Sequence, residues 1–160
     1  MPIIHPALFR TQCKVQMHAD ARGGAAILAG MKFARAVFGI AGAFGVLALA
    51  PLYFMFDLVG RQDPPPITHP QFYYGFAGVA LAFQFVFLAI ARDPMRFRPM
   101  MIPSMLEKVS YVGALLVLYL ENRISVLQAA TGVPDALLGM LFAAAYMKTR
   151  RDKNYAAGTL

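Results

Sequence analysis

The clearest potential for chemistry lies in the last apolar run of the chain, where a polar and small-residue stripe recurs at helical spacing. The stripe consists of Gln128, Thr131, Gly132, Asp135, Gly139 and Tyr146. Steps of three, four and seven residues put its members on one face of a helix. An ionisable group inside an apolar helix is costly and often marks a functional site, so Asp135 is the candidate catalytic or proton-exchanging residue. Alternatively, Asp135 anchors the packing by bonding to a tyrosine or to Gln84.

Further polar and aromatic side chains suit a ligand that binds between the apolar runs. The candidate ligand-binding residues are Gln84, Tyr73, Tyr119, Gln128 and Thr131. Together they could line a cavity for a lipid- or quinone-like molecule. The alternative is an aromatic belt, because tyrosines commonly lie at the membrane–water interface.

A basic stretch from Ala91 to Lys108 contains the densest motif in the sequence. Its candidate residues are Asp93, Arg96, Arg98, Glu107 and Lys108. Glu107 and Lys108 are adjacent and project about 100° apart on a helix, so we do not expect them to pair. We expect Glu107 to meet Arg96 or Arg98, and Lys108 to snorkel towards headgroup phosphates. The motif is therefore interpreted chiefly as a cytoplasmic topological anchor.

Several other chemistries find no support in the sequence. The single cysteine, Cys13, permits neither an internal disulfide nor a cysteine-based zinc site. Two of the three histidines lie near the N-terminus, so no pair of intramembrane haem ligands is available. HExxH, Walker and GxSxG motifs are missing. We expect no metal and no cofactor.

Composition indicates a membrane protein of one domain. The chain has 160 residues, of which 59% are hydrophobic and 14% are charged. Its mean hydropathy is +0.55. Such an excess of apolar surface needs lipid as its solvent. The net charge of +7 fits basic cytoplasmic loops and anionic lipid headgroups better than nucleic acid.

Hydropathy predicts four transmembrane helices, at about residues 36–56, 71–91, 104–120 and 124–147. A helix rises about 1.5 Å per residue, and the hydrocarbon core is about 30 Å thick. We expect Ser104 and Glu107 to form the capping box that begins the third helix. The fourth helix either begins near Ile124 and kinks at Pro134, or begins near Thr131. We prefer the first, which places Asp135 near mid-membrane.

Basic residues alternate along the chain and predict the orientation. The N-terminal tail, the three connecting segments and the C-terminal tail contain, in this order, 5, 1, 4, 1 and 4 Lys and Arg residues. The positive-inside rule then places both termini and the Arg96 loop in the cytoplasm. We expect a weakly ordered tail or a short interfacial helix at 1–30, with Met1, Met17 and Met31 as possible starts. The four-helix domain covers 31–150, and a basic tail covers 151–160.

The motifs resemble those of a group of small, functionally unassigned bacterial four-helix membrane proteins. The resemblance rests on Ala91-Arg-Asp-Pro-Met-Arg-Phe-Arg-Pro99, Leu106-Glu-Lys108, Tyr73-Tyr-Gly-Phe76 and Asp135-Ala-Leu-Leu-Gly139. It covers about residues 31–150 and implies a location in the bacterial inner membrane, but it implies no activity. In helix number and size alone, the architecture is similar to that of DoxX-like proteins.

We therefore expect an all-α, up-and-down bundle of four transmembrane helices. The leading hypothesis is a non-catalytic bundle that binds lipid or associates with a membrane-protein partner or a second copy of itself. The alternative is a membrane enzyme or carrier for a hydrophobic small molecule, with Asp135 as its acid/base or proton site.

Overall fold

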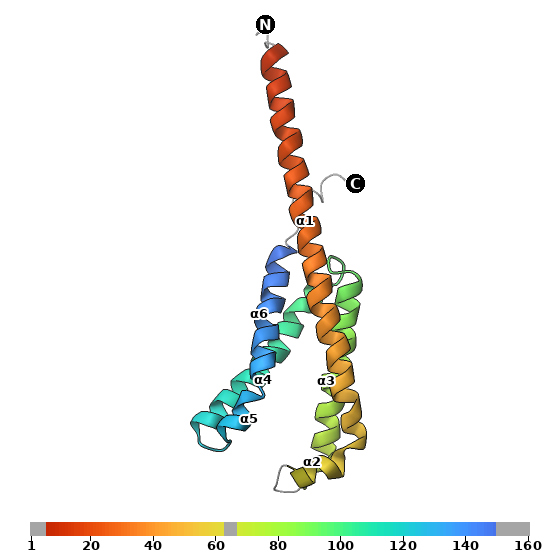
Figure 1. Ribbon diagram of the computed structural model, residues 1–160, viewed down its shortest axis with the longest axis vertical. Helices are drawn as coiled ribbons and strands as arrows, with labels where there is room; N and C mark the ends of the chain where they lie inside the picture. Colours follow the sequence, from red (N-terminus) through yellow and green to blue (C-terminus); the bar gives the residue numbers. More distant parts are fainter. Residues whose placement is uncertain (1–5, 63–66, 150–160) are drawn as a thin grey trace.

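The computed structural model describes residues 6–62 and 67–149, with side chains from residue 23 onwards, and in these ranges it consists of helices joined by short loops, without strands (Figure 1). The long helices are α1 (Pro6–Leu49), α3 (Pro70–Arg92), α4 (Met101–Leu120) and α6 (Val133–Lys148). Shorter elements connect them: η1 (Ala50–Phe54), α2 (Phe56–Gln62), η2 (Arg98–Met100) and α5 (Val126–Ala130).

Four segments of the described chain are long and apolar enough to cross a membrane. They are Gly23–Phe54, Pro70–Arg92, Arg98–Leu120 and Val126–Lys148. The prediction of an all-α fold with four spanning helices is therefore confirmed. The third segment begins earlier than expected, at Arg98, and its 23 residues are enough to cross the hydrocarbon core.

The chain before the first predicted span is helical rather than irregular. Helix α1 begins at Pro6 and continues through Met31 without a break. For residues 1–30 we expected a weakly ordered tail or a short interfacial helix, and residues 6–30 belong to a 44-residue helix that continues into the first span. The predicted basic C-terminal tail, 151–160, lies outside the described residues.

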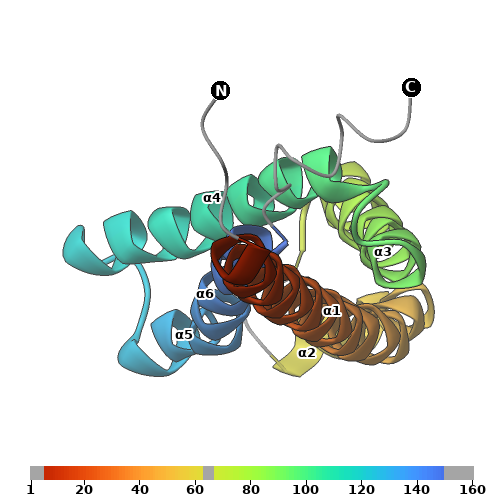
Figure 2. The ribbon, with the colours of Figure 1, turned by 90° about the horizontal axis from the view of Figure 1, so that it is seen from above.

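The four long helices form two pairs. Helix α1 packs along α3, and α4 packs along α6 (Figures 1 and 2). The pairs are joined mainly where α1 packs on α6, whereas α3 and α4 contact each other little. In Figure 1 the pairs meet near the end of α6 and diverge towards α2 and α5. The bundle is thus closed at one end and open at the other.

Three phenylalanines fill the core where the helix pairs meet. Phe38 of α1 stacks on Phe142 of α6, with ring centroids 4.1 Å apart. Phe87 of α3 meets the Phe142 ring edge-on at 4.9 Å. All three side chains are fully buried. Because lipid is as apolar as these rings, their contribution comes from close packing rather than from removal from water.

Glycines on α1 allow its neighbours to approach closely. A Cβ atom at Gly42 would lie 2.9 Å from the backbone oxygen of Gln84 on α3. At Gly30 a Cβ atom would overlap the backbone oxygen of Lys148 on α6. Small residues at helix interfaces have this role in membrane proteins. These two glycines therefore bring α1 close to two different helices, α3 and α6.

The third and fourth spans begin differently from the prediction. Ser104 lies inside α4, where its hydroxyl donates to the backbone oxygen of Met100, so the expected Ser104–Glu107 capping box is wrong. A capping box does occur before α5, between Ser125 and Gln128. Helix α5 then ends at Ala130, and α6 begins at Val133 with Pro134 in its first turn. Both proposals for the fourth span were partly correct: the span starts near Ile124, and Asp135 lies in a helical first turn.

Candidate functional site

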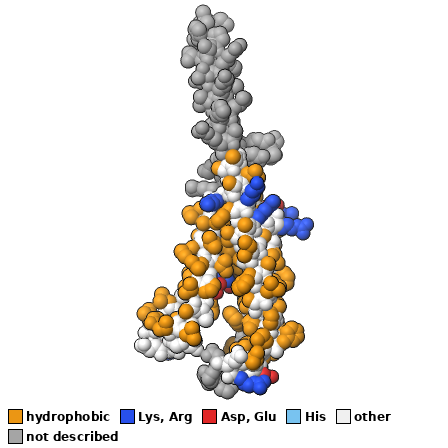
Figure 3. Space-filling model, viewed as in Figure 1, with side chains coloured by type: hydrophobic (Ala, Val, Ile, Leu, Met, Phe, Trp, Pro, Cys, Tyr) orange, Lys and Arg blue, Asp and Glu red, His pale blue; other side chains and the backbone are white. Residues whose placement is uncertain are grey.

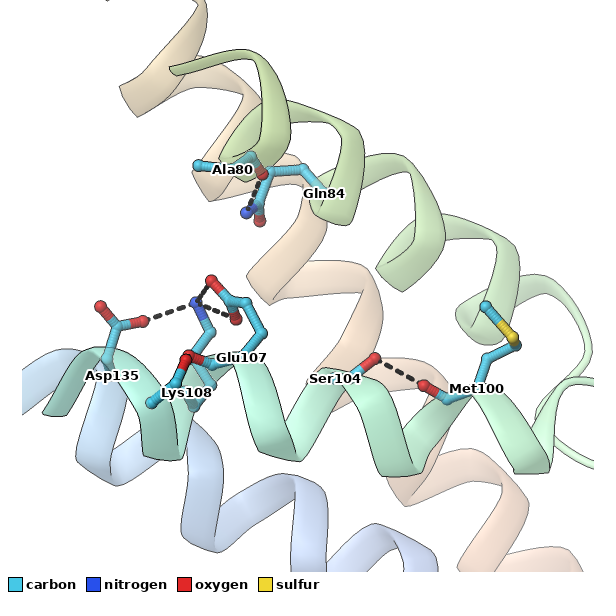
Figure 4. Close-up of polar contacts among 8 residues, drawn as sticks. Ala80, Gln84, Met100, Ser104, Glu107, Lys108 and Asp135 are labelled. Carbon is cyan, nitrogen blue, oxygen red and sulfur yellow. Dashed lines mark hydrogen bonds and ion pairs between the residues drawn. The ribbon is translucent and has the colours of Figure 1, made fainter. Parts of the chain in front are cut away.

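An ion pair joins the third and fourth spanning segments near their midpoints. The Nζ atom of Lys108 on α4 lies 2.6 Å from Oδ1 of Asp135 on α6 (Figure 4). Lys108 lies about ten residues into its span, which is roughly 15 Å at the helical rise. Asp135 lies about nine residues into the fourth span, at a similar depth from the opposite end. The predicted mid-membrane position of Asp135 agrees with this arrangement.

Glu107 completes a cluster of three charged groups. The Nζ atom of Lys108 also lies 3.0 Å from Oε2 of Glu107 and donates to its Oε1 atom at 3.2 Å. The prediction that these adjacent residues do not pair is wrong, because both side chains are long enough to bend towards the same space. The prediction that Lys108 reaches headgroup phosphates is also wrong. Its side chain is only 8% exposed and is directed towards the carboxylates.

Two residues of α3 lie close to this charged cluster. The Phe87 ring centroid is 5.4 Å from Nζ of Lys108, a distance that allows a cation–π interaction. Gln84, which is 3% exposed, donates through Nε2 to the backbone oxygen of Ala80 (Figure 4). Within the described part of the chain, no hydrogen-bond donor reaches its amide oxygen. Gln84 was a predicted ligand-binding candidate, and it borders the charged cluster.

A cavity of about 560 Å³ opens beside the charged cluster, between the two helix pairs. Figure 3 shows a hollow at this level with blue and red side-chain atoms at its margin. All four long helices line the cavity, which we call the cleft. Its apolar lining is Ala41, Phe44, Gly45, Leu49, Phe76, Val79, Ala80, Pro134 and Leu138. Its polar lining is Gln84, Glu107, Lys108, Ser110, Tyr111 and Asp135.

The other predicted ligand-binding residues lie outside the cleft lining. Tyr73 donates to the backbone oxygen of Leu52 and packs in an aromatic group with Phe56 and Tyr74. Gln128 belongs to the N-terminal cap of α5, and the hydroxyl of Thr131 donates to the backbone oxygen of Gln128. Tyr119 lies near the end of α4 and is 41% exposed. Of the polar stripe on the fourth span, only Asp135 therefore lines the cleft, whereas Gln128 and Thr131 form hydrogen bonds at the ends of α5.

The predicted cytoplasmic motif divides between two places. The Asp93 carboxylate accepts a hydrogen bond from the backbone nitrogen of Arg96 at 3.1 Å, which closes the turn after α3. The Arg98 guanidinium stacks 3.8 Å from the Tyr146 ring centroid and donates to the backbone oxygen of Tyr146. Neither arginine pairs with Glu107 in the described structure, so that prediction is wrong. Arg96 and Arg98 fix the loop, whereas Glu107 and Lys108 belong to the cleft.

Sequence reasoning missed Lys108 as a partner of Asp135, together with Phe87, Ser110 and Tyr111 as neighbours. The signal that could have indicated the pair is the position of Lys108. If the third span begins at Arg98, Lys108 lies near the middle of that span, as Asp135 does in the fourth. Two oppositely charged residues at similar depth in successive spans are the natural partners for each other.

In the part of the chain that the structure describes, no three His, Cys, Asp or Glu residues gather in a way that could hold a metal ion.

The chain matches no family model, no curated protein and no solved structure. A functional interpretation therefore rests on the geometry of the cleft and its charged cluster.

Proposed function

We propose that this protein binds an amphipathic, lipid- or quinone-like molecule in the cleft and does not convert it chemically. One observation carries the proposal: a largely apolar cavity within the spanning segments has charged and amide groups at one end. Ligand sites are commonly apolar cavities of about 300–1,000 Å³ with a few polar groups that orient the ligand. The polar groups would hold a head group, and the apolar walls would hold a hydrophobic body.

Charge placement supports an inner-membrane protein with both termini in the cytoplasm. Arg92 ends α3, and Arg96 and Arg98 lie between α3 and α4, whereas the loop on the opposite side after α4 carries only Arg123. Although Lys108 lies inside the span rather than in this loop, the alternation of rich and poor segments remains. Lys and Arg side chains gather around the closed end of the bundle in Figure 3. We propose that this end faces the cytoplasm.

A membrane enzyme or carrier is the second candidate, and one observation favours it. Asp135, Glu107 and Lys108 are ionisable, lie near mid-membrane and contact a cavity. Such groups are typical of proton-linked transport and of acid–base chemistry. Asp135→Asn separates the candidates: loss of a measured conversion or proton flux in a folded variant would favour the enzyme or carrier. Retained conversion or flux per folded molecule would remove Asp135 from that role.

Filling the cleft tests the binding proposal directly. Val79 of α3 lines the cleft and Val109 of α4 does not, although the two residues are similarly exposed, at 61% and 64%. Both variants, Val79→Trp and Val109→Trp, add the same volume. Native mass spectrometry of protein purified in mild detergent, followed by extraction of the bound molecules, should show a bound amphiphile in wild type and Val109→Trp. Val79→Trp should lose that amphiphile while remaining folded.

The contrary result would be equal retention of amphiphile by Val79→Trp and Val109→Trp. That outcome would show that the molecules bind to the outer, lipid-facing surface. Crosslinking should also give the same amount of dimer for wild type and for Val79→Trp. A dimer that is lost in Val79→Trp would mean that a second copy fills the cleft.

A further inference from the structure

We infer that the cleft selects amphipathic molecules with a cationic ammonium head, an inference that rests on the proposed binding function. The charged cluster contains two carboxylates, Glu107 and Asp135, and one ammonium group, Lys108. When all three are ionised, the cluster has one more negative than positive charge. No other Lys or Arg side chain lines the cleft in the described structure. An uncompensated charge in a low-dielectric site is costly, so a ligand that brings one positive charge is favoured.

Hydrogen bonding favours the same kind of head group. The ammonium of Lys108 already contacts both carboxylates, so its donors are engaged within the protein. The groups left to meet a ligand at this end are chiefly acceptors. They are the remaining carboxylate lone pairs and the amide oxygen of Gln84, which lies against Gly45 of α1 and accepts no hydrogen bond from the described residues. A protonated amine supplies both N–H donors and the missing charge, whereas a carboxylate or phosphate head would be repelled.

The apolar walls accommodate the rest of such a molecule. Phe76 of α3 and Tyr111 of α4 both line the cleft and contact each other, with ring centroids 6.4 Å apart. Aromatic faces attract cations as well as apolar groups, so the walls are compatible with a lipophilic amine along their whole length. The carboxylates are also partly accessible, with side chains 21% and 24% exposed. A head group could therefore reach them without separating α4 from α6.

The test compares two probes of the same chain length in phosphatidylcholine nanodiscs: dodecylammonium and uncharged dodecanol. Empty nanodiscs supply the background, and Val79→Trp supplies the blocked cleft. Wild type should bind dodecylammonium at least about tenfold more tightly than dodecanol after background subtraction. Glu107→Gln removes the excess negative charge but leaves the 2.6 Å contact between Lys108 and Asp135. This variant should lose at least about tenfold in dodecylammonium affinity and little in dodecanol affinity.

A second variant covers the case in which Glu107→Gln does not fold. Gln84→Leu removes the amide acceptor and alters no charge, and it should weaken dodecylammonium binding more than dodecanol binding. The inference is overturned if wild type does not prefer the ammonium probe, or if a folded variant keeps the full preference. Failure of Val79→Trp to reduce binding of either probe would instead overturn the proposed function, so the two failures are distinguishable.

Discussion

Lys108 and Asp135 connect α4 to α6 through an Nζ–Oδ1 contact of 2.6 Å. Among the described residues, theirs is the only ion pair that joins two spanning helices. Glu107 contacts the same ammonium but comes from the same helix as Lys108. The three charges therefore differ in what their removal leaves behind, and this difference can be measured.

Lys108→Met should be the most destabilising of the single charge changes. It leaves two neighbouring carboxylates without a cation, and removal of one partner from a buried pair costs about 3–5 kcal/mol. Glu107→Gln should change the free energy of unfolding by less than about 1 kcal/mol, because Lys108 keeps Asp135 and an amide oxygen can still accept from it. Unfolding in detergent, followed by circular dichroism, measures both. Equal stability of the two variants would mean that the pair does not hold the helices together.

Phe87→Ala should loosen the closed end of the bundle. Phe87 is fully buried and meets Phe38, Phe142 and Lys108, so truncation leaves a cavity at the meeting point of the helix pairs. The expected loss is about 3–5 kcal/mol. Phe85, two residues earlier on the same helix, is 59% exposed and provides the matched control. Phe85→Ala should have little effect in the same unfolding assay, and a comparable loss there would argue against the assigned core.

Gly42→Ala should separate α1 from α3. The added methyl group would lie 2.8 Å from Cγ of Leu88 and 2.9 Å from a backbone oxygen that cannot rotate away. Overpacking of this kind costs about 1–3 kcal/mol. Gly113 on α4 has no atom within 4 Å of the same added group. Gly113→Ala should therefore be neutral or stabilising by up to about 1 kcal/mol, because alanine favours helix. A reversed order of melting temperatures would contradict the α1–α3 contact.

Cysteine labelling should reveal the orientation. In a Cys13→Ser background, Thr68→Cys and Met100→Cys place single thiols at exposed positions on opposite sides of the membrane. A membrane-impermeant maleimide should label Thr68→Cys in intact cells, and Met100→Cys only after the cells are opened. This follows from the arginines beside Met100 and the positive-inside rule. Labelling of Met100→Cys in intact cells would reverse the proposed orientation.

The sequence predicted the spans because lipid imposes a length and an apolar composition that can be counted. Counting residues at the helical rise placed Asp135 near mid-membrane, and in the structure Asp135 lies near the middle of the fourth spanning segment. Helix ends were predicted less well. Ser104 and Glu107 have the spacing of a capping box, yet Ser104 lies in the helix interior and the actual box lies at Ser125 and Gln128. The same short pattern fits both positions, and tertiary packing decides between them.

The partner of Lys108 could not be found from spacing along one helix. Asp135 lies on another element, and the contact depends on how α4 packs along α6. Adjacent helical residues have Cβ atoms that point about 100° apart. Glu and Lys side chains are long enough for their charged ends to meet nevertheless, as those of Glu107 and Lys108 do. A cavity between the spans was expected, but of the candidate ligand-binding residues only Gln84 lines the cleft, because the cleft results from the divergence of two helix pairs rather than from any run of residues.

The distribution of charge between the two helix pairs has a consequence for biogenesis. The chain has no Lys, Arg, Asp or Glu between Arg35 and Asp57 or between His69 and Arg92, so the apolar part of each of the first two spans can leave the translocon as an independent hydrophobic segment. The third span carries Glu107 and Lys108 near the bilayer centre and the fourth carries Asp135, and insertion of one charged side chain there costs about 2.5–3.5 kcal/mol. Since Lys108 and Asp135 neutralise each other only when both are present, the second hairpin is expected to partition into lipid as a unit. The third span would then wait at the lateral gate until the fourth has been synthesised.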